Sequence, residues 1–200
     1  GLRTYGNELH PERFSQARRR LDHCLNGARE FLETAGRFNL VFDNPPYDHE
    51  LGGGRMEVAH IQADLELLLP GGLGIWVIPE TIIDFDLCNL FVTHLTQITI
   101  RRFPLPEFDR FKQVVIFGIK RPGPASYTYT QVGKLEKVVQ QGAPVLQAKE
   151  FAFEFTTDTE PITTFALKFP EAAAILDEIE AGGLHLGESW QTLMGSQGKT

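Results

Sequence analysis

The stretch FNLVFDNPPYDHE, Phe38 to Glu50, decides how the fold of this chain is interpreted. It begins with an apolar run that is typical of a strand buried on both faces of a parallel sheet. It then changes to an acid, an amide and two prolines, with Tyr47 after them. Because proline cannot donate to a strand ladder, the two prolines predict that the strand ends here.

The residue types of this corner suit the binding of a flat, conjugated amino group. Pro46 constrains Pro45 to an extended backbone, so the Pro45 carbonyl is expected to point outward. The Asn44 side chain supplies a second acceptor oxygen, and Tyr47 offers a ring on which a planar group can stack. Two acceptors that draw the hydrogens of one NH₂ group out of its plane favour tetrahedral nitrogen, whose lone pair can then attack.

The remaining pattern predicts an α/β sheet with a reversed edge. Strands are expected at residues 2–9, 38–42, 73–78, 97–103 and 114–119, and helices at 11–25, 55–69 and 82–95. The last two strands are separated by the short stretch PLPEFDRFKQ, which leaves no room for a crossover helix, so they are expected to pair antiparallel. Pro70-Gly71-Gly72 is expected to end the second helix.

The C-terminal part is predicted to be a small α+β segment behind a linker. RPGPAS, residues 121–126, has linker composition. Alternation predicts edge strands at 127–130 and 151–155, and apolar spacing predicts a helix at 170–181. A turn with Trp190 buried is expected near the end of the chain.

Composition limits the classes of partner and setting. The net charge of −7 argues against a broad basic face for nucleic acid, although a local basic rim or a basic second subunit stays open. The apolar runs are too short to cross a bilayer. Cys24 and Cys88 lie in stretches with helical spacing and are interpreted as buried thiols in a reducing, cytoplasmic setting. The dispersed histidines predict no metal site.

The segment DNPPYD after an apolar strand resembles the motif of the S-adenosylmethionine-dependent amino-methyltransferases, which methylate adenine N6, the guanine amine or a glutamine amide. Three further segments resemble parts of that family in the same order. RTYGNELHPERFSQARRRLD resembles its second strand and helix, and LLLPGGLGIWVIP resembles the stretch before and within its fifth strand. FDRFKQVVIFGIKR resembles its closing antiparallel strand. The resemblance runs from Leu2 to about Arg121. It implies a Rossmann-like class I methyltransferase sheet.

The resemblance also implies roles for individual residues. Asn44 and Pro45 would accept from the target amine, Pro46 would set the turn, and Tyr47 would stack on the base. Glu8 matches the acid that holds the ribose hydroxyls of S-adenosyl-L-methionine. Asn26 stands near the position where relatives carry an acid for the cofactor adenine, which Asn26 could bond through its amide oxygen.

The implied activity is methyl transfer to a planar amino nitrogen, with adenine N6 in DNA favoured and the base flipped out of the duplex. RNA or protein-glutamine methylation stays open, as does a non-catalytic fragment or scaffold subunit. The expected organisation is a partial catalytic domain at 1–122 and an accessory segment at 123–200.

One departure from the family pattern affects the sheet. The first strand and glycine-rich turn of the family should precede residue 1, so the sheet is expected to be truncated at its N-terminal side. A fragment of a longer protein is favoured, and a partner chain that completes the sheet, or an inactive cofactor site, is the alternative.

The sequence also shows a group of basic residues near the expected antiparallel pair of strands. This group consists of Arg101, Arg102, Arg110, Lys112 and Lys120. It would either bind phosphates near the substrate or form an ordinary solvated edge of the sheet. The glycines at 52–54 are read as a surface loop or a hinge.

Overall fold

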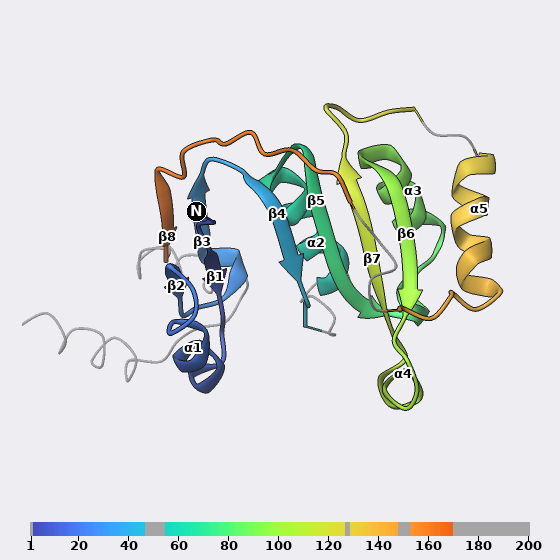
Figure 1. Cartoon of the computed structure of the whole chain (residues 1–200), viewed down its shortest axis with the longest axis horizontal. Helices are drawn as coiled ribbons and strands as arrows, with labels where there is room; N and C mark the ends of the chain where they lie inside the picture. The colour runs from blue at the N-terminus through green and yellow to red at the C-terminus, as the bar shows by residue number, and fades with distance from the viewer. Residues whose placement is uncertain (1, 47–54, 127–128, 148–152, 170–200) are drawn as a thin grey trace, which may run out of the picture. The chain divides into compact units, whose positions relative to one another are not determined.

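The computed structural model describes residues 2–46, 55–126, 129–147 and 153–169 (Figure 1). The chain forms two compact units, Gly1–Thr34 with Thr164–Thr200, and Ala35–Thr163. The predicted division into a catalytic domain at 1–122 and an accessory segment at 123–200 rests on family resemblance and stays a prediction.

The first unit contains two small sheets. Strand β1 pairs in parallel with β2, and β3 pairs with β8. The elements are β1 Tyr5–Asn7, α1 Pro11–Ala17, β2 His23–Leu25, a 3₁₀ turn at Arg29–Phe31, β3 Leu32–Ala35 and β8 Thr164–Leu167.

The predicted helix at 11–25 is much shorter in the structure. It ends at Ala17, and His23–Leu25 form a strand, so Cys24 lies on β2 and is only partly buried. The Asp22 carboxylate accepts from the backbone N–H of Thr4 at 2.8 Å and from its hydroxyl at 2.9 Å. These bonds fix the residues after α1 beside β1, where strand pairing satisfies the backbone that a longer helix would have used.

The second unit is a four-stranded sheet in the order β4-β5-β7-β6 (Figure 1). Strands β4 and β5 are parallel, and β7 is antiparallel to both β5 and β6. The elements are β4 Phe38–Asp43, α2 Met56–Leu67, β5 Leu68–Pro79, a 3₁₀ turn at Glu80–Ile82, α3 Phe85–His94, β6 Leu95–Arg102, α4 Glu107–Phe111, β7 Gln113–Lys120 and α5 Tyr129–Gln140.

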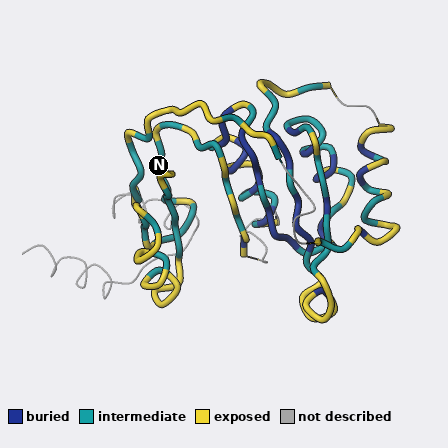
Figure 2. Tube along the Cα trace, in the orientation of Figure 1, coloured by how far each residue is buried: buried dark blue, intermediate teal, exposed yellow. Residues whose placement is uncertain are grey.

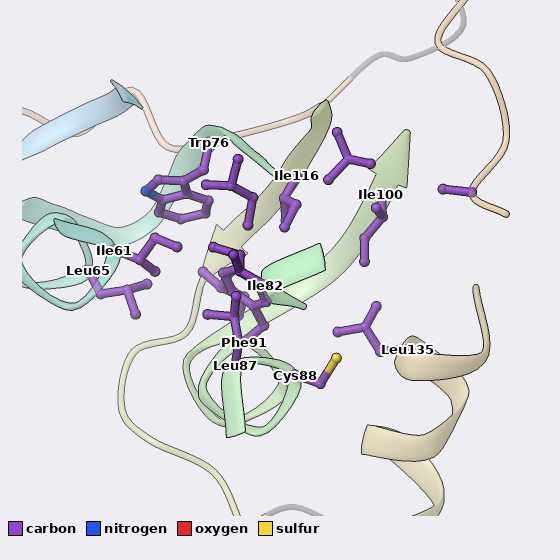
Figure 3. Close-up of a cluster of buried hydrophobic side chains, with 14 of the residues drawn as sticks. Ile61, Leu65, Trp76, Ile82, Leu87, Cys88, Phe91, Ile100, Ile116 and Leu135 are labelled. Atoms are coloured by element: carbon purple, nitrogen blue, oxygen red, sulfur yellow. The ribbon is translucent and has the colours of Figure 1, made fainter. Parts of the chain in front are cut away.

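The core of this unit lies between the sheet and helices α2 and α3 (Figure 3). Trp76 of β5 and Phe91 of α3 are fully buried, and their ring centroids are 5.9 Å apart. Helix α2 adds Ile61 and Leu65, and Leu135 of α5 joins the same cluster. Burial of side chains of this size stabilises by about 1.5–3 kcal/mol each.

Two expectations for the sheet need correction. The antiparallel pairing of the last two strands is confirmed, but the reversed strand β7 lies between β5 and β6 and not at an edge. Strand β4 was expected to be buried on both faces. Among the described strands it lies at the edge of its sheet, and Leu40 and Phe42 are 44% and 62% exposed.

Pro70-Gly71-Gly72 does not end helix α2 as expected. The helix stops at Leu67, and strand β5 begins at Leu68 and continues through these residues. Gly71 has a φ of 78°, which a residue with a side chain rarely adopts, and the register with β4 shifts between Phe38 and Leu40. The three residues therefore bend the start of a strand.

The C-terminal expectations are mostly wrong where the structure describes them. Tyr129 begins helix α5 where an edge strand was predicted, and Val132 is buried in the core. Residues 153–155 are irregular, although the Phe153 ring stacks on Phe117 of β7 at 5.4 Å. The predicted helix at 170–181, the turn at Trp190 and the loop at 52–54 lie outside the described residues.

None of the helices in the described ranges is long and apolar enough to cross a membrane.

Candidate functional site

The carboxyl ends of β4, β5 and β6 lie at one edge of the sheet, because β7 is antiparallel to its two neighbours and β4 is parallel to β5. Figure 1 shows this edge at the lower side, with α4 beyond it. Asn44 follows β4, Glu80 follows β5 and Arg102 ends β6. Open α/β sheets bind ligands at this kind of edge.

The double-proline corner ends β4 as predicted. The strand stops at Asp43, and the next three residues have no regular structure. Pro45 is buried, whereas Asn44 and Pro46 are exposed. Pro45 thus anchors the corner, and Asn44 lies at the surface. Tyr47 lies outside the described residues, so its stacking role stays a prediction, as do the acceptor roles of Asn44 and Pro45.

Helix α2 is tied to the strands that carry the corner by two polar contacts. His60 Nδ1 lies 3.0 Å from Asp43 Oδ2, and the two side chains are only 14% and 23% exposed. Behind them, Trp76 Nε1 donates to Asp64 Oδ2 at 3.0 Å inside the core. Because Asp43 directly precedes Asn44, the first contact fixes the backbone from which Asn44 projects.

Two buried carboxylate oxygens near this edge have no hydrogen-bond partner among the residues that the structure describes. Glu57, in the first turn of α2, is fully buried. Its Oε1 lies 3.4 Å from Arg55, and its Oε2 has no partner within the described ranges. Glu80 Oε1, at the end of β5, is buried and unsatisfied as well. Buried polar atoms without partners are rare in folded proteins, and strain, a catalytic role, or a bound water or ion can account for them. The sequence analysis missed both residues.

The predicted cofactor residues Glu8 and Asn26 lie together in the first unit. The Asn26 amide donates to the carbonyls of Glu8 at 2.7 Å and Leu9 at 3.0 Å. The Glu8 Oε1 accepts from the His10 N–H at 2.8 Å and pairs with Arg13 at 3.1 Å. Glu8 therefore also stabilises the N-terminal end of α1, as acids near helix N-termini often do.

This arrangement fits the ribose and adenine of a nucleoside cofactor. Glu8 is 25% exposed at the carboxyl end of β1, where a carboxylate can accept from hydroxyl groups. Asn26 donates both of these bonds through Nδ2, which directs its amide oxygen to the opposite side as an acceptor. Within the described ranges, no group of three or more His, Cys, Asp or Glu side chains could hold a metal ion.

The sequence profile of an uncharacterised methyltransferase family (DUF6094) matches residues 2–144. The chain belongs to this methyltransferase family. Among solved structures, it is similar to a protein of Listeria monocytogenes provisionally assigned as a class I S-adenosylmethionine-dependent methyltransferase, with a TM-score of 0.54 and 10% identity. The match covers 70% of this chain and 55% of that chain. No curated protein matches.

These matches confirm the predicted α/β class I methyltransferase fold, whose cofactor is S-adenosyl-L-methionine. The chain spans about half the length of the solved methyltransferase that it resembles.

Proposed function

We propose that this methyltransferase transfers a methyl group from S-adenosyl-L-methionine to a planar amino nitrogen, with adenine N6 in DNA as the favoured substrate. The observation that carries the proposal is the corner after β4, where Asn44 is exposed at the carboxyl edge and Pro45 is buried beneath it. Acceptor oxygens at the carboxyl edge of an open α/β sheet can contact a ligand without any large rearrangement of the sheet.

The corner would work by holding the amine in a reactive geometry. The Asn44 amide oxygen and the Pro45 carbonyl would each accept one amine hydrogen, and the nitrogen lone pair would be left to attack. The cofactor supplies an activated methyl group on a sulfonium. With the cofactor bound, the methyl group would leave the sulfonium for the amine nitrogen, and one amine proton would be lost to solvent. Acceptors fixed in advance are effective because they need no reorganisation during the reaction.

The polar contacts behind the corner would keep these acceptors in place. Asp43 is held by His60, and Trp76, its partner across the β4–β5 ladder, is held by Asp64. Positioning errors of about 1 Å can cost about 100-fold in rate, so the His60 contact would matter for turnover although His60 touches no reacting atom.

We also propose that a further strand pairs with β4 in the working enzyme, supplied by a partner chain or by another segment of the same protein. What supports this is the edge position of β4 among the described strands, with exposed Leu40 and Phe42. Exposed apolar edge strands tend to pair with other chains. Slow amide exchange along β4 in the full-length protein would support the proposal, and rapid exchange would contradict it.

The test of the activity is an Asn44→Ala variant of the full-length protein. The expected result is a fall in methyl transfer of about 100- to 1,000-fold, because one preorganised acceptor is removed. Binding of S-adenosyl-L-methionine, followed by calorimetry, should be nearly unchanged. Asn89→Ala is the matched control, since Asn89 lies on α3 and contacts Thr93.

Labelled methyl groups would be followed into DNA, RNA and protein substrates. Transfer to adenine N6 of DNA is the expected outcome. Transfer to RNA or to a glutamine amide would overturn the substrate assignment and leave the reaction class intact. Unchanged turnover in Asn44→Ala would overturn the role of the corner.

A further inference from the structure

The connection between β6 and β7, residues 103–112, extends beyond the carboxyl edge of the sheet (Figure 1). It contains the short helix α4, and we refer to residues 103–112 as the α4 arm. Figure 2 shows that the arm is mostly exposed. A ten-residue connection that protrudes at the ligand-binding edge is a common place for binding residues.

The arm presents apolar side chains to solvent. Leu105 is 68% exposed and Phe111 is 53% exposed, whereas Phe108 is only 9% exposed. Phe108 anchors the arm, because Arg102 Cζ and Lys112 Nζ lie 5.3 and 5.0 Å from its ring centroid. Leu105 and Phe111 are left for an external contact.

Cations accompany these apolar side chains. Arg110 Cζ lies 5.0 Å from the centroid of the Phe111 ring, and Lys112 pairs with Asp109 at 3.1 Å while both side chains stay more than half exposed. Alternation of aromatic rings with guanidinium and ammonium groups suits a nucleic-acid strand, whose bases stack on rings and whose phosphates attract cations. The arm also carries Glu107 and Asp109, so it is neutral overall in a chain of net charge −7.

The base of the arm leads into β7 and is fixed to the end of β5, the strand that lies between β7 and β4. The Glu80 N–H donates to the Lys112 carbonyl at 2.8 Å, and Pro79 is paired with Gln113. Asp43 is paired with Trp76 on the same strand β5. The base of the arm is thus three to four residues farther along β5 than Asp43, about 10–13 Å at the rise of a strand. It lies on the opposite side of β5 from β4, and two strand spacings add about 10 Å across the sheet, so the separation is about 14–16 Å.

We propose that the α4 arm binds the polynucleotide strand beside the target base, with Phe111 and Leu105 against neighbouring bases and Arg110 and Lys112 near the phosphates. This inference rests on the proposed function, because the arm would bind the strand whose base is methylated at the double-proline corner. The separation of about 14–16 Å from the corner corresponds to four or five stacked bases at about 3.4 Å each.

The test uses the full-length protein and fluorescence anisotropy with a labelled oligonucleotide, which measures binding without needing turnover. Leu105→Ala combined with Phe111→Ala should weaken binding at least 10-fold, because each stacked base is worth a factor of this order. Arg110→Ala should reduce the slope of log K against log salt concentration by about 1. Affinity for S-adenosyl-L-methionine and thermal stability should not change.

Tyr129→Ala is the matched control. It removes an aromatic side chain that is 79% exposed at the start of α5, and α5 is reached through the linker that follows the opposite end of β7. Oligonucleotide binding by this variant should equal that of the wild type.

The outcomes separate the arm from the proposed function. If the arm variants bind the oligonucleotide as tightly as the wild type, the arm assignment is overturned, whereas sensitivity of turnover to Asn44→Ala still tests the reaction. If the wild type binds no polynucleotide but methylates a protein glutamine, the arm assignment fails and the corner chemistry remains.

Discussion

His60 Nδ1 lies 3.0 Å from Asp43 Oδ2, so helix α2 holds the residue that directly precedes Asn44. Replacement of His60 by alanine should lower the free energy of unfolding by about 1–3 kcal/mol, because the half-buried Asp43 carboxylate loses its partner. It should also lower kcat more than the affinity for cofactor. Denaturant unfolding and steady-state kinetics check both effects.

His60→Gln is the matched variant, since its amide can still donate to Asp43. Recovery of most of the lost kcat in His60→Gln would indicate a positioning role. Equal loss in both variants would contradict that role.

Gly74 faces the Trp76 ring so closely that a Cβ atom there would lie 2.0 Å from the ring edge. Gly74→Ala should therefore displace the indole and destabilise the protein by about 1–3 kcal/mol. Gly133, in α5, has open space where a Cβ would lie, so Gly133→Ala should stabilise by about 0.5–1 kcal/mol. Thermal melts of the two variants should show a lower Tm for Gly74→Ala and a higher Tm for Gly133→Ala than for the wild type. Equal changes of Tm in the two variants would refute the packing argument.

Burial raises the pKa of the Cys88 thiol to about 12, with smaller contributions from Glu136 and Asp84. Above the ordinary thiol pKa, the unfolded chain ionises at Cys88 while the folded chain does not. Stability should therefore be unaffected by this group below about pH 9 and should fall by up to about 1.4 kcal/mol per pH unit above it.

The measurement is the denaturant midpoint at several pH values between 8 and 11 for the wild type and Cys88→Ala. The variant should lose stability less steeply with rising pH. Parallel curves would show that Cys88 does not contribute to the pH dependence.

Phe42 is 62% exposed on the edge strand β4. Phe42→Lys should change the free energy of unfolding of this chain by no more than about 0.5 kcal/mol and should reduce self-association, because a charge on an edge strand opposes strand pairing. Phe91→Ala, in the core, should instead cost about 3–5 kcal/mol. Sedimentation velocity and urea unfolding separate the two effects, and stronger association of Phe42→Lys would disprove the edge argument.

The end of β4 and the antiparallel pairing of β6 with β7 could be predicted from the sequence, because each follows from a strict local constraint. Pro45 and Pro46 cannot donate to a ladder, and the connection between β6 and β7 is too short for a crossover helix. The edge position of β4 could not be predicted, because an apolar run has the same pattern at an edge and at the centre of a sheet until its neighbours are known.

Local patterns misled the prediction elsewhere. The alternation around Tyr129 favoured a strand, but Val132 and Leu135 bury one face of a helix against the core. His23–Leu25 continued the helical spacing of α1, but pairing with β1 decided their conformation. Tertiary contacts outweigh weak local preferences in such short segments.

The end of β4 at the double-proline corner and the position of Glu8 after a strand could be predicted, because each has a recognisable residue type there. The hydrogen bond from Asn26 to the Glu8 carbonyl could not, because it joins residues 18 positions apart. The buried carboxylate of Glu57 could not be predicted either. An acid in the first turn of a helix is ordinary for the helix dipole, and only the burial of its side chain distinguishes it.

The buried indole of Trp76 is a built-in fluorescent probe of the double-proline corner after β4. It is one of two tryptophans in the chain, is fully buried, and is paired across the ladder with Asp43. In a Trp190→Phe background its blue-shifted emission would come from this residue alone. Substrate engagement at Asn44 could then be followed by fluorescence in real time, without any dye attached to the enzyme.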